Sequence, residues 1–451
     1  MQFLLLPLTF LSKFFDVYGF FLVFLVILWT LFKRPEDIPK IIPSWKTFIF
    51  WSVMILFQFL AMLLSFPFSA KANIPIGMFK SFSLILEEVL MIWMVYAFSK
   101  LFIVSKIDAV KFIRWAIYGY ILYSFLVIVP EVFITLGFHF FDGYINFLAS
   151  IFETRWTGRT DFYGLGSYVV TQGRVNGFEG ESPVFANLLG VVYIPIFIGL
   201  IIGKDHSVFK KPAFILWPLV IFSMVVLLMA KTTTGILTII FLYISWLFFS
   251  NSKDRRFLLF MGIIGLLIIG CSYIFINPVH TIFNQFLFQK QGTSNRIGGT
   301  IGLILTFLSK PIFGTGQGFA GYFINENVPL WSTHNWEYQY IYSKLGYPVL
   351  SGLFGAFAQY GLVIMVPFLF FFSKYIFNLS AKRKHYFNLG VRRDDFYFSM
   401  LNSSEITLFV IIFSSILSFD LFKWSIFFIL FFYWRIMYLS DIKNKKFPEI
   451  N

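Results

Sequence analysis

Residues 183–202 read PVFANLLGVVYIPIFIGLII, a run without a single charged side chain. A helix of about 20 apolar residues is long enough to cross a hydrocarbon core about 30 Å thick. A membrane β-barrel would instead show segments of about 10 residues with alternating polarity. The stretch therefore predicts a transmembrane helix.

Runs of the same kind recur from one end of the 451-residue chain to the other. Only 13% of the residues are charged, whereas soluble domains carry about 25%, and no separate soluble domain is visible. We expect an all-α polytopic integral membrane protein in which residues 1–451 form a single membrane-embedded domain. The stretch 2–12 is either a further span or half of a broken first helix, which gives about 11–12 transmembrane helices. The predicted spans are 17–32, 47–67, 80–101, 112–133, 183–202, 213–230, 235–250, 257–276, 351–372, 403–420 and 422–438.

Lysine and arginine concentrate on alternate connections between these spans. Basic residues mark the cytoplasmic side of a membrane protein, so these connections are expected to face the cytoplasm. The net charge of +14 then reflects topology and attraction to anionic membrane lipid, and no nucleic-acid partner is expected. The basic connections are 33–46, 100–114, 204–211, 253–256, 374–393 and 443–446.

The opposite face carries two long loops, 134–182 and 277–350. Loops longer than about 15 residues are usually functional or disordered, and the aromatic and glycine content of these two argues against disorder. We expect each loop to form short helices that rest on the outer membrane surface. Residues 336–347, WEYQYIYSKLGY, have the pattern of one such amphipathic interfacial helix.

Basic residues are depleted on the outer face of membrane proteins, so the presence of arginines there requires a specific explanation. The arginine fork suits bidentate phosphate binding, and an external phosphate next to lipid indicates a lipid-linked diphosphate. Alternatively, the arginines pair with nearby carboxylates or with lipid headgroups. Both interpretations stay open for Arg155 and Arg159, whereas the sequence around Arg174 and Arg296 favours phosphate binding.

Several outer-face residues are candidates for proton transfer. His334 is the first choice of general base, because histidine titrates near neutrality, although a lone loop histidine is often structural. Glu181 is the second choice. Glu87 and Glu88 interrupt an apolar span, where ionisable groups are functional candidates, or they simply reach the outer interface.

An apolar helix is predicted from Arg296 to Lys310, and the turn Gly314-Thr315-Gly316-Gln317-Gly318 follows it. Such a turn can present backbone N–H groups to an anion, which makes Gly316 a further candidate. The sequence contains no D-x-D, no H-E-x-x-H, no paired-cysteine spacing and no P-loop. We therefore expect no metal, no cofactor and no use of nucleoside triphosphates.

Four segments together resemble one superfamily, the bacterial O-antigen polymerases and O-antigen ligases. The resemblance covers roughly residues 174–350, and the hydrophobic layout extends it to the whole chain. Here Ser182-Pro183 replaces the family's Pro-Ser order, and Thr233 occupies the place of an arginine, for which Lys231 is a substitute. The segments are RVNGFEGESPVFA (174–186), TTTGIL (232–237), SNRI with KPIFGTGQG (294–297 and 310–318) and HNWEYQYIYSKLG (334–346).

The resemblance implies a multi-pass protein of the bacterial inner membrane with its active site facing the periplasm. The donor and the acceptor would be undecaprenyl-diphosphate-linked oligosaccharides, and a separate chain-length regulator would be a partner. By resemblance, the enzyme is a metal-independent glycosyltransferase. The substrate-binding residues would be Arg174, Arg296 and Lys231, to which the outer-face argument adds Arg159. His334 and Glu181 would be catalytic residues, and Asn335 is an additional candidate from the His-Asn segment.

Polymerase and ligase differ in the acceptor. A polymerase transfers the glycan to a hydroxyl of another lipid-linked repeat unit, whereas a ligase transfers it to lipid A–core. The apolar, aromatic-rich composition and the long outer loops favour the polymerase. A transporter of lipid-linked oligosaccharide is the alternative of another class, and it predicts polar residues through the full depth of the bundle.

Overall fold

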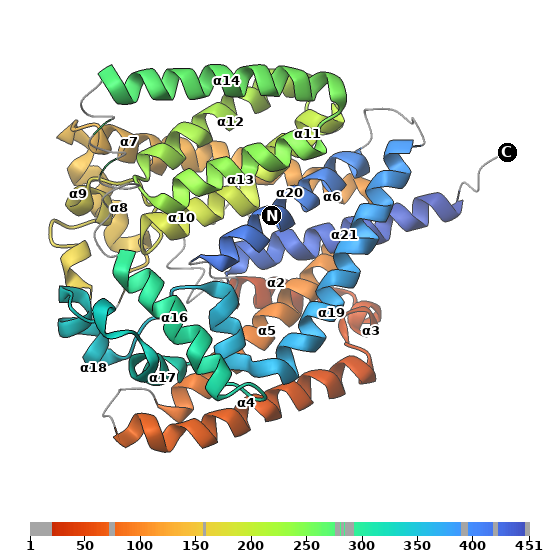
Figure 1. Ribbon diagram of the computed structural model, residues 1–451. Coiled ribbons are helices and arrows are strands. Elements are labelled where there is room, and N and C mark those ends of the chain that lie inside the picture. Colours follow the sequence, from red (N-terminus) through yellow and green to blue (C-terminus); the bar gives the residue numbers. More distant parts are fainter. Residues whose placement is uncertain are drawn as a thin grey trace.

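Residues 20–71, 77–156, 159–275, 293–388, 396–417 and 423–446, together with His280 and Asn284, are described by the structure, a computed structural model. Every regular element in these residues is helical, and Figure 1 shows that most of the long helices cross the molecule between two opposite ends. The α-helices are α2 (Phe20–Lys33), α3 (Ile38–Ile41), α4 (Trp45–Lys71), α5 (Met78–Phe102), α6 (Lys106–Tyr123), α7 (Val129–Thr135), α8 (Asp142–Phe152), α9 (Tyr168–Gln172), α10 (Ser182–Leu188), α11 (Ile194–Gly203), α12 (Pro212–Met229), α13 (Thr233–Phe249), α14 (Ser252–Phe275), α16 (Thr293–Ser309), α17 (Ala320–Asn327), α18 (Ser343–Leu345), α19 (Gly352–Asn388), α20 (Phe396–Ile416) and α21 (Trp424–Lys446).

The predicted spans coincide with helices along the chain, from α2 to α21. Eight helical segments among the described residues are long and apolar enough to cross a membrane, and α2 and α13 contribute shorter apolar helices. The class of all-α multi-pass membrane protein is therefore confirmed. Of the 11–12 expected crossings, eight have a helix of sufficient length and hydropathy among the described residues. The stretch 2–12 lies outside the described residues. Helix α19 continues to Asn388, beyond the apolar run 351–372. An apolar run shows only the part of a helix that lies in the hydrocarbon core, and the helix itself can continue into water.

The run 183–202 forms the most deeply buried of these segments. Residues Ser182–Gly203 form α10, a π-helical turn and α11, and 94% of the most apolar window is buried. Pro195 has no N–H to offer the carbonyl of Val191, one turn earlier. Thr407 of α20 satisfies that carbonyl with its Oγ1 at 2.9 Å. A polar side chain from a neighbouring helix thus stabilises an irregular helix in an apolar surrounding.

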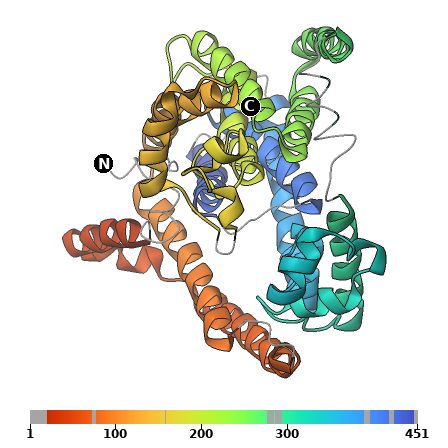
Figure 2. The same ribbon diagram turned by 90° about the vertical axis from the view of Figure 1, so that its left-hand side faces the viewer.

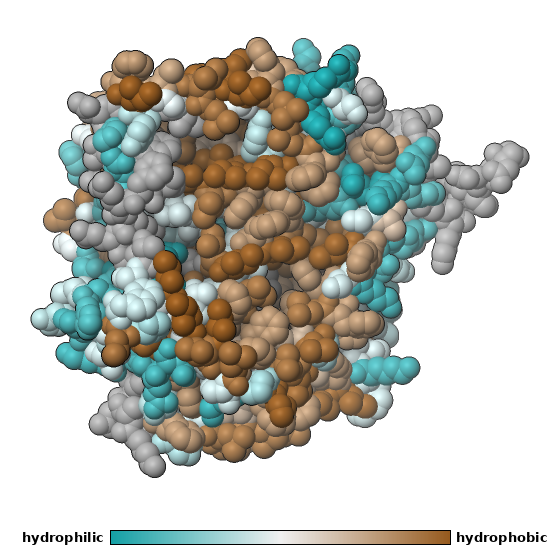
Figure 3. Space-filling view, viewed as in Figure 1, coloured by the Kyte–Doolittle hydropathy of each residue, from teal (hydrophilic) through white to brown (hydrophobic). Residues whose placement is uncertain are grey.

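Figure 3 shows a broad apolar band across the molecule, with hydrophilic residues gathered at the two ends. We call one of them the loop end, because it carries α8, α9, α17 and α18 (Figures 1 and 2). The other, the basic end, contains the connections α5–α6, α11–α12 and α13–α14 (Figure 1). Arg114 of α6 donates there to the carbonyls of Ser207 and Val208, at 2.8 and 3.0 Å. The band and the two ends are the surface that a membrane-spanning bundle requires.

Helix α19 is broken near its start, and the glycine turn 314–318 fits into the break. Gly361 has φ 62° and ψ −177°, a region that only glycine occupies readily. The N–H groups of Leu362 and Val363 donate to the carbonyls of Pro311 and Ile312, at 2.8 and 3.1 Å. The break therefore ties α19 to the segment that follows α16.

Substitution of Gly361 by alanine should remove this junction. A Cβ atom at this position would lie 2.4 Å from the carbonyl oxygen of Ile312, and backbone strain of this kind costs about 1–3 kcal/mol. We expect a clear fall in the thermal unfolding midpoint of the purified protein. Gly265→Ala in α14 is the matched control, because nothing lies within 4 Å of its added Cβ. Equal midpoints for the two variants would contradict this description of the junction.

Candidate functional site

Two cationic side chains meet at the loop end, Arg174 and Lys231. The Lys231 ammonium donates to the carbonyl of Gly173 at 2.9 Å and to that of Thr135 at 3.4 Å. Burial lowers the pKa of Lys231, and the positive charge of Arg174 lowers the pKa further. Both residues were predicted from sequence to bind a diphosphate, and the structure brings them together.

Glu181 lies in the same neighbourhood. Burial raises the pKa of the Tyr168 hydroxyl, while the positive charge of Arg174 lowers this pKa and the negative charge of Glu181 raises it. Arg174 and Glu181 therefore act electrostatically on the same side chain, although six residues of chain separate them. Two cations, one carboxylate and one phenol form what we call the Arg174 cluster: Arg174, Lys231, Glu181 and Tyr168.

The chain between Arg174 and Glu181 is held by buried polar groups. Glu131 Oε2 accepts the backbone N–H groups of Asn176 and Gly177, at 3.0 and 2.8 Å. The Tyr123 hydroxyl donates to the carbonyl of Gly177 at 2.5 Å. Gly177 has φ 57° and a Cβ there would lie 2.1 Å from that hydroxyl. Only glycine fits this position, so the segment has one well-defined path.

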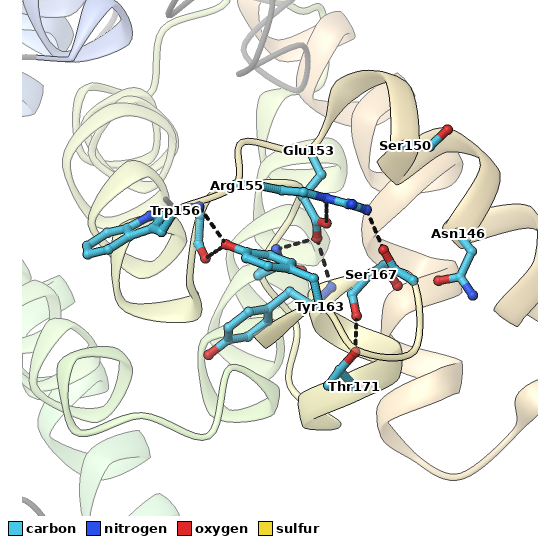
Figure 4. A network of polar contacts seen from close by, with 12 residues as sticks. Asn146, Ser150, Glu153, Arg155, Trp156, Tyr163, Ser167 and Thr171 are labelled. Carbon is cyan, nitrogen blue, oxygen red and sulfur yellow. Dashed lines mark hydrogen bonds and ion pairs between the residues drawn. The ribbon is translucent and has the colours of Figure 1, made fainter. Parts of the chain in front are cut away.

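A second buried carboxylate, Glu153, supports the same segment (Figure 4). Its Oε1 accepts the N–H of Tyr168 at 3.0 Å and the side-chain amide of Asn176 at 3.1 Å. Burial raises the pKa of Glu153, and these hydrogen bonds together with the charge of Arg155 lower it. Arg155 Nε lies 3.4 Å from Glu153 Oε2. Arg155 is thus paired internally, as one of the two interpretations of the sequence had it.

Helix α10 begins at Ser182, directly after Glu181. Glu181 occupies the cap position, and no side-chain capping hydrogen bond is made there. Tyr163 closes this turn, because its hydroxyl donates to the carbonyl of Gly180 at 2.8 Å.

A separate polar cluster forms in the second long loop. Asn295 donates through Nδ2 to Asn335 Oδ1 at 3.0 Å and to Glu337 Oε2 at 2.9 Å. Asn335 Oδ1 also accepts the N–H of Tyr338 at 2.9 Å, which is the bond of a helix N-cap. The helix that follows runs from 336 to 345, close to the predicted 336–347. Its location at a membrane surface stays a prediction.

This second-loop cluster orders the chain beside two predicted site residues, Arg296 and His334. Arg296 follows Asn295 in α16 and is partly buried, and His334 precedes Asn335 and is exposed. Tyr347 donates from its hydroxyl to the carbonyl of Asn295 at 2.7 Å. The Asn295–Asn335 contact thus joins the Arg-helix segment to the His-Asn segment.

Arg159 belongs to the first loop and reaches the second. Its Nη2 is 3.0 Å from Asp161 Oδ2, and its Nη1 is 3.6 Å from Glu337 Oε1 in the second loop. The guanidinium also stacks on Phe162, with its central carbon 3.7 Å from the ring centroid. Arg159 is therefore paired with protein carboxylates and links the first loop to the second-loop cluster.

The glycine turn 314–318 does not offer its amides to an anion in this structure. The N–H groups of Thr315 and Gly316 donate to the carbonyls of Ala358 and Gln359, both at 2.9 Å. Those of Gln317 and Gly318 donate to Gln58 Oε1 and Gln359 Oε1, both at 3.1 Å. All four groups bond within the protein, so Gly316 has a role in packing the broken helix α19.

Glu88 belongs to the same turn and not to the Arg174 cluster. Gln317 Nε2 donates to Glu88 Oε1 at 2.5 Å, and Glu88 is partly buried. Its neighbour Glu87 is exposed. The predicted membrane carboxylate thus has a structural contact, at the junction of α5 with the glycine turn.

Sequence reasoning overlooked the groups that support the site. Among these groups, Glu131 could have been identified from the sequence, because a carboxylate beside Pro130 interrupts the predicted span 112–133. Lys423 Nζ lies 3.6 Å from Glu179 Oε2 and adds a third cation to the segment 174–181. Among the described residues, no group of three or more His, Cys, Asp and Glu side chains is arranged to hold a metal ion.

Comparison of the chain with protein-family models, with curated proteins and with solved structures finds no match.

Proposed function

We propose that the protein is a polymerase of a bacterial surface polysaccharide, acting at the periplasmic face of the inner membrane. It would transfer an undecaprenyl-diphosphate-linked glycan to a hydroxyl of a second lipid-linked repeat unit. The observation that carries this proposal is the Arg174 cluster at the loop end, where two cations, a carboxylate and a tyrosine lie beside an apolar band.

The arrangement suits a substrate with a lipid tail and a diphosphate. The band in Figure 3 is of the kind that accommodates polyprenyl chains in a bilayer. Arg174 and Lys231 can form charge-assisted hydrogen bonds with phosphate oxygens. Those bonds strengthen as the diphosphate leaves with its negative charge, which is the requirement for lowering the activation barrier.

The chemical step needs one proton acceptor. The bond between the anomeric carbon and the diphosphate oxygen breaks, and a bond from that carbon to the acceptor hydroxyl oxygen forms. The hydroxyl proton passes to a general base. Glu181 is the base we assign, because it occupies the cap position of α10 at the end of the segment that Arg174 begins and both residues act on Tyr168. His334 is the competing candidate. Arg296 would contact the substrate from the second loop. Arg159 links the two loops, because its Nη1 lies 3.6 Å from Glu337 Oε1.

A strain that lacks the protein tests the reaction class. If the protein is the polymerase, lipid A–core should carry a single repeat unit in place of long chains, because ligation still proceeds. Complementation with the wild-type chain should restore the long chains. Complete absence of repeat units from lipid A–core would identify a ligase and contradict the polymerase proposal.

A further inference from the structure

A cavity of about 510 Å³ lies at the basic end, between the ends of α11, α12, α13 and α14. This volume is within the usual range for small-molecule sites, about 300–1,000 Å³. The helix ends that line it lie at the opposite end of the bundle from α8 and α9 (Figure 1). No step of the proposed reaction uses it.

The inner wall of the cavity is aromatic. Trp217 and Trp246 line it with ring centroids 5.1 Å apart, and Phe257 of α14 lies 6.5 Å from Trp217. Phe214 also lines the cavity, and 81% of its surface is exposed. Tryptophan prefers the level where membrane hydrocarbon meets water. The wall therefore suits the part of an acyl chain that lies next to the lipid headgroup.

The rim of the cavity is basic. Lys204, Lys210 and Lys211 line it, and all three are exposed. In the ranges that the structure describes, no carboxylate forms an ion pair with any of these three ammonium groups. Asp254 is the acidic lining residue, and it accepts a hydrogen bond from Asn251 at 2.7 Å. The rim thus carries an excess of positive charge.

Helix α14 lines one side of the cavity, and its outer surface is exposed. Only 6% of the most apolar window of that helix is buried in the protein, and its apolar side chains, such as Phe260 and Leu266, are exposed. A lipid can therefore reach the space beside α14 from within its leaflet. A free phosphate ion would engage the lysines but leave the aromatic wall without a partner.

We propose that this cavity binds an anionic phospholipid from the leaflet at the basic end. Lys204, Lys210 and Lys211 hold the headgroup phosphate, and one acyl chain lies along the aromatic wall of the cavity. Charge complementarity at the rim selects an anionic headgroup over a zwitterionic one. This inference stands independently of the polymerase proposal.

Lipid binding by the full-length protein tests the site. The purified protein would be titrated with phosphatidylglycerol, and with phosphatidylcholine as the zwitterionic comparison, and native mass spectrometry would count the bound lipids. The triple variant K204Q/K210Q/K211Q should lose at least tenfold in phosphatidylglycerol affinity. The control variant K46Q/K111Q/K384Q removes the same charge from exposed lysines of other basic connections, and its affinity should stay within twofold of wild type.

A second pair of variants tests the acyl-chain wall. Phe214→Ala should weaken phosphatidylglycerol binding several-fold, whereas Phe377→Ala, at an exposed position of α19, should not. Millimolar inorganic phosphate should fail to compete with the lipid. Equal losses in the two lysine variants would mean general surface attraction, and competition by phosphate would mean a free-anion site. Either result would overturn the proposal.

Discussion

Alanine in place of Arg174 should abolish long-chain polymer in cells while the abundance of the protein stays normal. Loss of one preorganised charged donor costs about 10²–10³ in rate when that donor stabilises developing charge. Arg174 meets this condition in the proposed reaction, because the leaving diphosphate gains charge in the transition state. The measurement is the length distribution of the surface polysaccharide in a complemented deletion strain. Arg296→Ala should have the same phenotype.

Two further variants separate phosphate binding from a general need for charge. Arg174→Lys keeps the positive charge but loses the bidentate fork, so it should restore only part of the polymer. Lys344→Ala removes an exposed cation of the second loop and should leave the polymer unchanged. Wild-type polymer from Arg174→Ala would exclude Arg174 from the site.

Glutamine in place of Glu181 should lower the polymerisation rate by about 10²–10⁴, because it preserves the shape of the side chain but cannot accept the proton. The rate would be measured with purified protein and saturating donor. Donor binding should change little, since Arg174 and Lys231 remain. This split between rate and binding distinguishes a base from a residue that only supports the fold.

The competing base is tested in parallel. His334→Gln should retain most of the activity if Glu181 is the base. Glu326→Gln, at an exposed position of α17, is the matched control for Glu181→Gln. The opposite pattern, an active Glu181→Gln and an inactive His334→Gln, would transfer the role to His334.

Hydropathy predicted the helices well because the bilayer imposes one length on every crossing. The run 183–202 became the most buried of the candidate spans. Hydropathy could not predict how irregular helices are stabilised, since those contacts join distant parts of the chain. The carbonyl of Leu126, which Pro130 leaves without its helical donor, accepts the hydroxyl of Tyr144 at 3.1 Å.

Arg174 and Lys231 were predicted as site residues from motif position, and in the structure the charge of Arg174 acts on Lys231. The role of Arg159 could not be resolved, because pairing with Asp161 and phosphate binding produce the same local sequence pattern. Gly316 looked like part of an anion site, but its N–H donates to Gln359 in the break of α19. That break depends on a contact between residues about 45 positions apart, which no local pattern encodes.

Polymerisation in vitro tests the central claim most directly. Purified protein would receive a defined undecaprenyl-diphosphate-linked repeat unit as both donor and acceptor, with and without a metal chelator. The account predicts lipid-linked products of two or more repeat units, release of undecaprenyl diphosphate, no effect of the chelator and no product with Arg174→Ala. Transfer that occurs only when lipid A–core is supplied, or equal product from wild type and Arg174→Ala, would contradict it.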